Sequence, residues 1–206
     1  MRSFPGDGSA HPADGVSPRP AAARTVRRDL RRILPILLIG ILAAGFLNKS
    51  AGGLPGGDTV TTVVIVRHAE KDASGPNPRL TEAGRKRAAR LARILADEPV
   101  SLLVSSDRAR TTETLEPLAA RTGLPLTIVP VGSGRDEHAK NLADTIRAHP
   151  GGTIVVSNHS DVIPLLLREL GVTGTISIPD TEYGKLFIII LGPGGSATVL
   201  RLRYDD

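Results

Sequence analysis

Polar and charged side chains, arginines and histidines among them, follow three apolar runs of the sequence, at the point where each run ends. They are Arg67, His68 and Glu70 after "VVIV", Ser105, Ser106, Asp107, Arg108 and Arg110 after "SLLV", and Asn158, His159, Ser160 and Asp161 after "TIVVS". Arginine offers phosphate oxygens a planar, permanently charged fork. A neutral imidazole can attack phosphorus and divide one difficult displacement into two easier ones. Together, these residue types indicate a site for a phosphoryl group.

Each piece of this pattern is weak evidence when it stands alone. An arginine beside a histidine at a strand end is more often structural than catalytic, and a single loop histidine such as His159 is more often hydrogen-bonded than reactive. In an open parallel sheet, however, ligands bind where the carboxyl ends of the strands meet the following helices. We therefore expect the side chains after the three runs to lie at one edge of a sheet.

Strand and helix patterns alternate from residue 59 to the C-terminus. Strands are predicted at 59–66, 101–105, 126–131, 152–157, 185–191 and 197–204, and helices at 82–98, 109–121, 136–148 and 162–170. In the first helix, Thr81 is the expected cap, and apolar residues recur at i, i+3, i+4 and i+7 from Ala88. The alternation predicts an α/β three-layer sandwich, with a mainly parallel central sheet, helices on both faces and a C-terminal hairpin.

The composition excludes several classes of function. The chain of 206 residues has no cysteine, so disulfides, thiolate nucleophiles and cysteine-bound metals are ruled out. The net charge of +5 resembles that of a nucleic-acid-binding protein, but residues 1–32, with seven arginines against three aspartates, carry +4 of it. The remaining residues are nearly neutral, whereas a nucleic-acid footprint belongs on the folded surface. We therefore expect no nucleic-acid partner.

The first 58 residues divide into three segments. Residues 1–32 are predicted to be a disordered basic tail, and residues 48–58 a glycine-rich linker that leads into a folded domain at 59–206. Between them, 33–47 is an uncharged apolar run whose 15 residues would span only about 22 Å as a helix, short of a hydrocarbon core of roughly 30 Å.

This length favours a signal-peptide segment, whereas the long preceding region and the lack of a small-x-small cleavage site favour a signal anchor. A buried core helix is the third possibility. The expected location is the cell membrane, through a single-pass anchor at 33–47, or outside the cytoplasm.

Five stretches of the domain resemble the histidine phosphatase superfamily, which includes the phosphoglycerate mutases. They are "RHAEK", "LTEAGRKRAARLA", "SSDRARTTETLEPLA", "VVSNHSDVIPLLL" and "EYGKLFII". The similarity extends from about Val60 to the C-terminus, in a short form without a large insertion. The resemblance implies that His68 is the nucleophile that becomes phosphohistidine, and that Arg67, Arg110 and His159 hold the phosphoryl oxygens. It also implies that neither a metal nor a cofactor takes part. Arg108 matches a variable position.

Many members of the superfamily use a carboxylic acid to protonate the leaving group, and the sequence leaves its identity open. The candidates are Asp136 and Glu137 just after the third strand, with Asp161 and Glu70 as alternatives. His138 and His149 are expected to be exposed helix residues.

The function that follows from the resemblance is phosphomonoester hydrolysis, acting on a phosphorylated small molecule or a phosphoprotein. The alternatives are a mutase-like phosphotransferase and a phospho-ligand binding module without turnover. A mutase needs a wall that keeps water from its phosphohistidine. Only 48 residues separate Arg110 from His159, and the stretch 72–79 is short. We therefore expect an open site and hydrolysis.

Overall fold

The computed structural model describes residues 59–132 and 134–205. The predicted tail, apolar segment and linker at 1–32, 33–47 and 48–58 lie outside the described residues, and their assignments stay predictions. Within the described part of the chain, no helix has the length and apolar character needed to cross a membrane.

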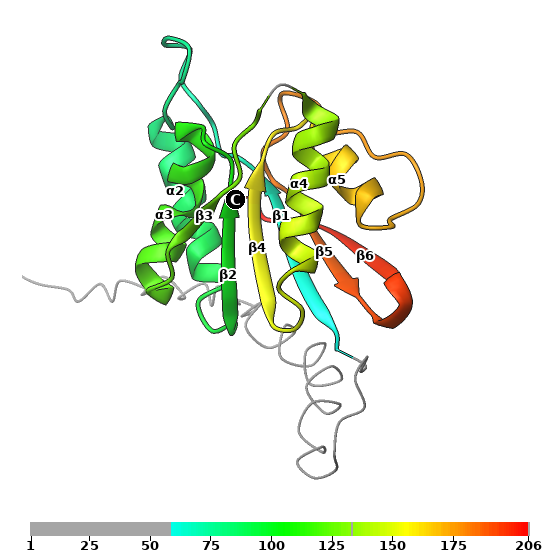
Figure 1. The fold of residues 1–206 in the computed structure, drawn as a ribbon. Coiled ribbons are helices and arrows are strands. Elements are labelled where there is room, and N and C mark those ends of the chain that lie inside the picture. Colours follow the sequence, from blue (N-terminus) through cyan, green and yellow to red (C-terminus); the bar gives the residue numbers. More distant parts are fainter. Residues whose placement is uncertain (1–58, 133, 206) are drawn as a thin grey trace, which may run out of the picture. The chain divides into compact units, whose positions relative to one another are not determined.

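Six strands form one mixed sheet in the order β3-β2-β4-β1-β5-β6 (Figure 1). The strands are β1 (Thr61–Arg67), β2 (Val100–Ser105), β3 (Leu126–Ile128), β4 (Thr153–Asn158), β5 (Lys185–Leu191) and β6 (Ala197–Arg203). β3, β2, β4 and β1 are parallel, whereas β5 runs antiparallel to β1 and β6 antiparallel to β5. The predicted mainly parallel sheet with a C-terminal hairpin is confirmed.

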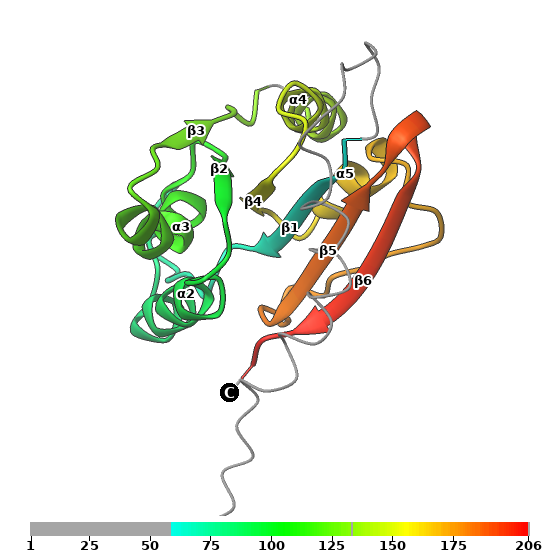
Figure 2. The same ribbon diagram turned by 90° about the horizontal axis from the view of Figure 1, so that it is seen from below.

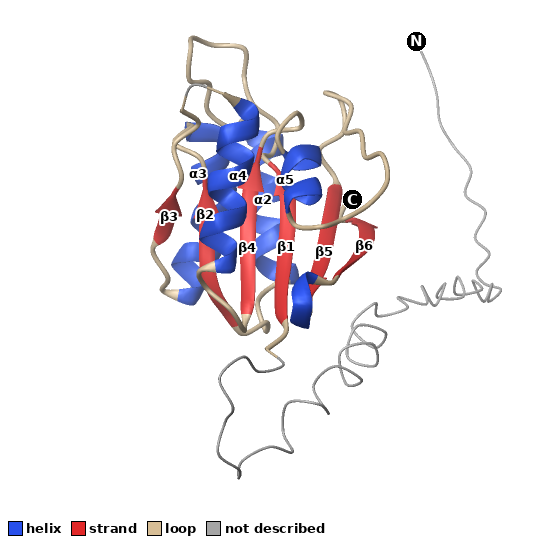
Figure 3. Cartoon of the chain, turned by 45° about the vertical axis from the view of Figure 1, so that its right-hand side comes forward, coloured by secondary structure: helices blue, strands red, loops and turns tan. Residues whose placement is uncertain are grey.

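Helices cover both faces of the sheet, so the three-layer prediction is also confirmed (Figures 2 and 3). They are α2 (Glu82–Ile94), α3 (Ala109–Thr122), α4 (Arg135–Arg147) and α5 (Ile163–Glu169), with a short 3-10 helix η2 (Pro193–Gly195) in the β5–β6 turn. α2 and α3 share an apolar core with one face of β1, β2 and β4. α4 and α5 form a larger core with the opposite face.

Local sequence signals explain where several elements begin and end. The Thr81 hydroxyl accepts a hydrogen bond from the Gly84 amide and caps α2 as predicted. α3 ends at Gly123, whose φ of 72° is a left-handed conformation that glycine adopts without strain. β3 stops at Ile128, short of the predicted 131; the Val129 amide still donates to the Ser105 carbonyl at 2.9 Å, but the Val131 amide donates to the Asp107 carboxylate at 3.2 Å and leaves the backbone ladder. β1 and β4 are buried almost throughout, and their parallel pairing brings their polar ends together at one edge.

Candidate active site

The parallel pairing of β1 and β4 sets two of the predicted motifs side by side. Arg67 lies opposite Asn158 in the register, and the His68 amide donates to the Asn158 carbonyl at 2.8 Å. The ring centroids of His68 and His159 are consequently only 5.5 Å apart. α3 begins beside them and brings the Arg110 Nη2 to 3.4 Å from the His159 Nδ1. The four residues predicted as catalytic are thus gathered at the carboxyl edge of the sheet.

The His68 ring is held in one tautomer. Its Nδ1 lies 2.8 Å from the Ala69 carbonyl oxygen, which can only accept, so Nδ1 carries the proton and donates it. Burial lowers the pKa of His68 to about 3; the hydrogen bond to the Ala69 carbonyl opposes this shift, and the neighbouring basic groups add to it. The imidazole is therefore neutral at physiological pH, and its Nε2 keeps the free lone pair that a nucleophile needs.

The backbone after His68 is fastened to two helices. The Ala69 amide donates to the Thr114 hydroxyl of α3 at 2.9 Å, and the Glu70 carbonyl accepts from the Thr81 amide at 2.9 Å. A Cβ at Gly84 would lie 2.2 Å from the Glu70 carbonyl oxygen. A glycine at this position lets the first turn of α2 approach the segment that carries the nucleophile.

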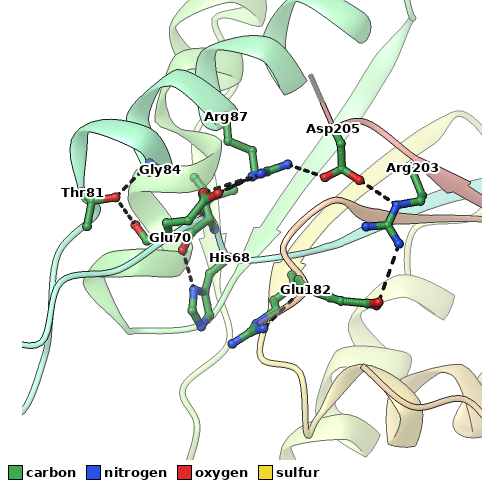
Figure 4. A network of polar contacts seen from close by, with 11 residues as sticks. His68, Glu70, Thr81, Gly84, Arg87, Glu182, Arg203 and Asp205 are labelled. Atoms are coloured by element: carbon green, nitrogen blue, oxygen red, sulfur yellow. Dashed lines mark hydrogen bonds and ion pairs between the residues drawn. The ribbon is translucent and has the colours of Figure 1, made fainter. Parts of the chain in front are cut away.

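Glu70, a candidate proton donor, is engaged elsewhere. Arg87 of α2 contacts both of its carboxylate oxygens at 2.8–3.0 Å and also reaches Asp205, which pairs with Arg203 (Figure 4). Burial alone would raise the pKa of Glu70, but the hydrogen bonds with Arg87 lower it overall. An ionised, bidentate carboxylate is a structural partner for Arg87 and a poor proton donor.

The other predicted donors have exposed side chains. Asp136 pairs with Arg168 at 3.2 Å, and Asp161 pairs with Arg135 at 3.5 Å, all with exposed side chains. Glu137 is exposed. None of the four candidate carboxyl groups is therefore fully buried in the described part of the chain.

Arg67 is almost completely buried, with 3% of its surface exposed, and is held by a loop that the sequence patterns did not single out. Its Nη1 donates to the carbonyls of Pro179 and Glu182 at 3.0 and 3.1 Å, and its Nη2 lies 3.4 Å from Asp180 Oδ1. The Tyr183 ring lies 4.2 Å from its guanidinium carbon. The loop before β5 has no apolar period, so only the "EYGKLFII" resemblance pointed to this region.

His159 also has a defined tautomer. The Arg110 guanidinium can only donate, so the His159 Nδ1 accepts, and the Nε2–H donates to the Ser106 hydroxyl at 3.2 Å. Burial and the charge of Arg110 lower the pKa of His159 to about 3. Without a bound anion, this second imidazole is also neutral.

Two buried guanidinium nitrogens lack partners. Among the described residues, neither Arg67 Nε nor Arg110 Nε has a hydrogen bond. Burial and the nearby charge of Arg108 lower the pKa of Arg110, although an arginine stays charged at physiological pH. A buried cation with an unused donor is costly, and an anion between the two arginines would satisfy both. Arg108 instead lies beside Asp107 at 3.7 Å with 40% of its side chain exposed, as expected for a solvated charge.

The two histidines predicted to be exposed have different environments. His149 is exposed as expected. His138 is fully buried, so that prediction was wrong. It belongs to the inward face of α4, beside Ala139 and Leu142, and its Nδ1 bonds to the Pro130 carbonyl at 3.0 Å. The sequence pattern did not reveal this carbonyl partner.

Part of the chain matches a known protein family. Residues 63–131 match the model of the histidine phosphatase superfamily (branch 1), a stretch that contains Arg67, His68 and Arg110 but ends before His159. No curated protein matches the chain. The resemblance to this superfamily that the sequence motifs indicated is thus confirmed over residues 63–131.

Solved structures of low sequence identity share the fold of the described domain. The protein histidine phosphatase SixA in complex with tungstate is 17% identical with a TM-score of 0.55, and the match covers 69% of this chain and 96% of SixA. A mycobacterial glucosyl-3-phosphoglycerate phosphatase is 17% identical with a TM-score of 0.53, covering 70% of this chain and 98% of that protein.

A phosphoserine phosphatase from Entamoeba histolytica, in complex with 3-phosphoglyceric acid, is 15% identical with a TM-score of 0.53, covering 71% of this chain and 98% of that protein. The superfamily match supports an activity of the phosphatase or mutase kind, and these neighbours show a shared fold.

Proposed function

We propose that this protein is a phosphomonoester hydrolase that works through a phosphohistidine on His68. One observation carries the proposal. A neutral imidazole with a free Nε2 lies at an edge where two arginines have unused Nε donors. That combination provides a nucleophile for phosphorus and positive charge for the phosphoryl oxygens.

The reaction takes two displacements. The His68 Nε2 lone pair attacks phosphorus, the P–O ester bond breaks, and its electron pair stays on the leaving oxygen. The hydrogen bond from Nδ1–H to the Ala69 carbonyl stabilises the positive charge that develops on the ring. A water molecule then attacks the phosphohistidine, which releases inorganic phosphate and restores neutral His68.

The arginines and His159 act on the charge of the transferring group. Arg67 and Arg110 donate to its equatorial oxygens, the electrostatic work that dominates phosphoryl transfer. A bound phosphoryl dianion favours the protonated form of a nearby imidazole. We therefore expect His159 to gain a proton when substrate binds and to become a third charged donor.

The leaving oxygen needs a proton unless it is a stable anion. The candidate carboxylates Glu70, Asp136 and Asp161 are held in ion pairs. We accordingly expect aryl phosphates, whose leaving groups are stable as anions, to react faster than alkyl phosphates. Similar rates for the two classes would indicate that one of these carboxyl groups protonates the leaving oxygen efficiently.

A phosphorylated small molecule is the substrate class that the neighbours favour, since two of them are phosphatases of phosphoserine and of a glucosyl phosphoglycerate. A panel of phosphate esters and one phosphohistidine protein, tested with the full-length chain with and without EDTA, examines this choice. We expect phosphate release that EDTA leaves unchanged. Phosphate binding without turnover on any ester would favour the binding-module alternative.

Hydrolysis is proposed over mutase activity because only β3, α4 and β4 lie between α3 and His159 in the described chain, which leaves little sequence for a wall over the site. The 72–79 loop is largely exposed and contacts the start of α3 through Asn77. We therefore expect water to reach the phosphohistidine. Incubation with 3-phosphoglycerate tests this point, and 2-phosphoglycerate accumulating faster than free phosphate would favour the mutase.

We also propose that residues 33–47 direct the protein to the membrane or out of the cytoplasm, on the strength of the uncharged apolar run after a basic segment. Fusing residues 1–58 to a reporter enzyme tests this. We expect the reporter in the membrane fraction or outside the cytoplasm, and a reporter left soluble in the cytoplasm would contradict the proposal.

A further inference from the structure

A fully buried histidine lies behind the two histidines of the site and takes no direct part in the proposed reaction. His138 and Asn158 each have 0% of their surface exposed. The His138 Nε2 lies 3.1 Å from the Asn158 Nδ2, and the Asn158 Oδ1 accepts from the His159 amide at 2.9 Å. The Asn158 backbone carbonyl accepts from the His68 amide at 2.8 Å. One asparagine thus holds the backbone of both His68 and His159.

The direction of every hydrogen bond in this set is determined from its two ends. The Pro130 carbonyl can only accept, so the His138 Nδ1 carries the proton and Nε2 must accept. The His159 amide can only donate, so the Asn158 oxygen must face it, which turns the Asn158 NH2 toward the His138 Nε2. Only the neutral Nδ1–H tautomer of His138 satisfies this arrangement.

We propose that the His138–Asn158 pair positions the two catalytic histidines, with His138 acting through Asn158. The inference rests on the proposed function for what the histidines do. The inference goes beyond the proposed function because it assigns a role to a residue of α4, the helix that packs on the opposite face of the sheet from α2 and α3. The loop after β3, the first turn of α4 and the end of β4 meet at these hydrogen bonds.

If the His138 Nε2 acceptor is removed, the buried Asn158 NH2 is left without a hydrogen-bond partner. This loss favours a rotation of the Asn158 side-chain amide. A turned amide would direct an N–H at the His159 N–H and release the backbone of His159. Burial lowers the pKa of His138, which agrees with a neutral ring. The negative charges of Asp107 and Asp161 raise the pKa of His138. A positive charge on His138 would in turn lower the pKa of the nearby His159.

The test compares three variants of the full-length protein, with p-nitrophenyl phosphate as substrate and inorganic phosphate as ligand. His138→Leu has no acceptor, whereas His138→Gln offers an amide oxygen to Asn158. His149→Leu is the matched control, since His149 is an exposed histidine just beyond the same helix. We expect kcat to fall on the order of 100-fold in His138→Leu, the scale of a small misplacement of reacting groups. His138→Gln should recover most of the loss, and His149→Leu should behave as the wild type.

Binding separates positioning from general damage. Arg67 and Arg110 make no hydrogen bond to His138 or Asn158 in the described structure, so His138→Leu should still bind inorganic phosphate. Its affinity should fall less than kcat does, because only the contribution of His159 to phosphate binding is disturbed. If His138→Leu fails to fold, the comparison of His138→Gln with the wild type and the ¹⁵N shifts of the His138 ring still decide. An Nε2–H tautomer in the wild type, or full activity of His138→Leu, would overturn the inference.

Failure of the proposed function looks different. A wild type that binds phosphate but hydrolyses no ester would contradict the hydrolase proposal. The inferred His138–Asn158 hydrogen bonds would then be judged from the ring shifts and from the phosphate affinities alone.

Discussion

The floor and the rim of the candidate site differ in how their charges are held. We define the floor as Arg67, His68, Asn158 and His159, which are at most 8% exposed. The rim consists of Arg108, Asp161 and Asp180, whose side chains are 40%, 50% and 91% exposed.

On the floor, neighbouring groups determine each tautomer and each hydrogen bond, whereas on the rim water competes for every contact. Substitutions on the floor should therefore affect chemistry strongly, and substitutions on the rim weakly.

Two arginines near the start of α3 give the sharpest contrast. Arg110 reaches His159 and has an unused Nε, whereas Arg108 lies beside Asp107 in solvent. Arg110→Ala should lower kcat/KM by about 10²–10³, the usual loss of one transition-state donor. Arg108→Ala should have a much smaller effect. Steady-state kinetics on an aryl phosphate measures both, and equal losses would mean that Arg108, assigned to the rim, acts on the substrate as Arg110 does.

Acid should destabilise the floor. Burial lowers the pKa of His68 and of His159 to about 3, whereas an unfolded histidine titrates near 6.5. The unfolded state therefore binds more protons below pH 6.5, and stability present above that pH is lost as the pH falls toward 3. Each histidine contributes up to about 1.4 kcal/mol per pH unit in this window.

Urea unfolding at pH 7 and pH 5, in phosphate-free buffer, measures this loss. His159→Gln removes one of the two groups and should show a shallower pH dependence than the wild type. His149→Gln, which alters an exposed histidine, serves as the control. The same slope in the wild type and in His159→Gln would show that His159 is not held neutral.

Asp180 tests the rim. Its carboxylate lies 3.4 Å from the Arg67 Nη2 and accepts from the Ser160 hydroxyl at 2.9 Å. The carboxylate therefore competes with an incoming phosphate for Arg67. Asp180→Asn removes a negative charge from this mouth, so KM and the inhibition constant of phosphate should fall by about fivefold at most, with kcat nearly unchanged. A loss of kcat beyond tenfold would instead indicate that Asp180 takes part in the proton transfer.

The floor could be predicted largely from the sequence because its residues follow buried strands directly. The β-branched run before Arg67 predicts β1, the run before Asn158 predicts β4, and parallel strands bring their carboxyl ends to one edge. The position of each motif along the chain was then enough to gather Arg67, His68 and His159 without any knowledge of distances.

Tertiary contacts decided what the sequence did not reveal. Asp180 and Tyr183 reach Arg67 from an irregular loop, which has no period to place it. His138 looked like a surface residue because it stands among charged helix residues. It is buried by a neighbouring loop carbonyl and by Asn158, neither of which a helix pattern can reveal. Glu70 looked free as an acid until α2 supplied Arg87.

Direct detection of the phosphoenzyme tests the central claim. The full-length protein is mixed with a ³²P-labelled aryl phosphate, quenched by denaturation at alkaline pH within the first turnover, and mapped by proteolysis. We predict an acid-labile label on the peptide that contains His68, and no label and no turnover in a folded His68→Ala variant. Undiminished hydrolysis by His68→Ala, or rapid wild-type turnover with no label at any quench time, would contradict a phosphohistidine mechanism.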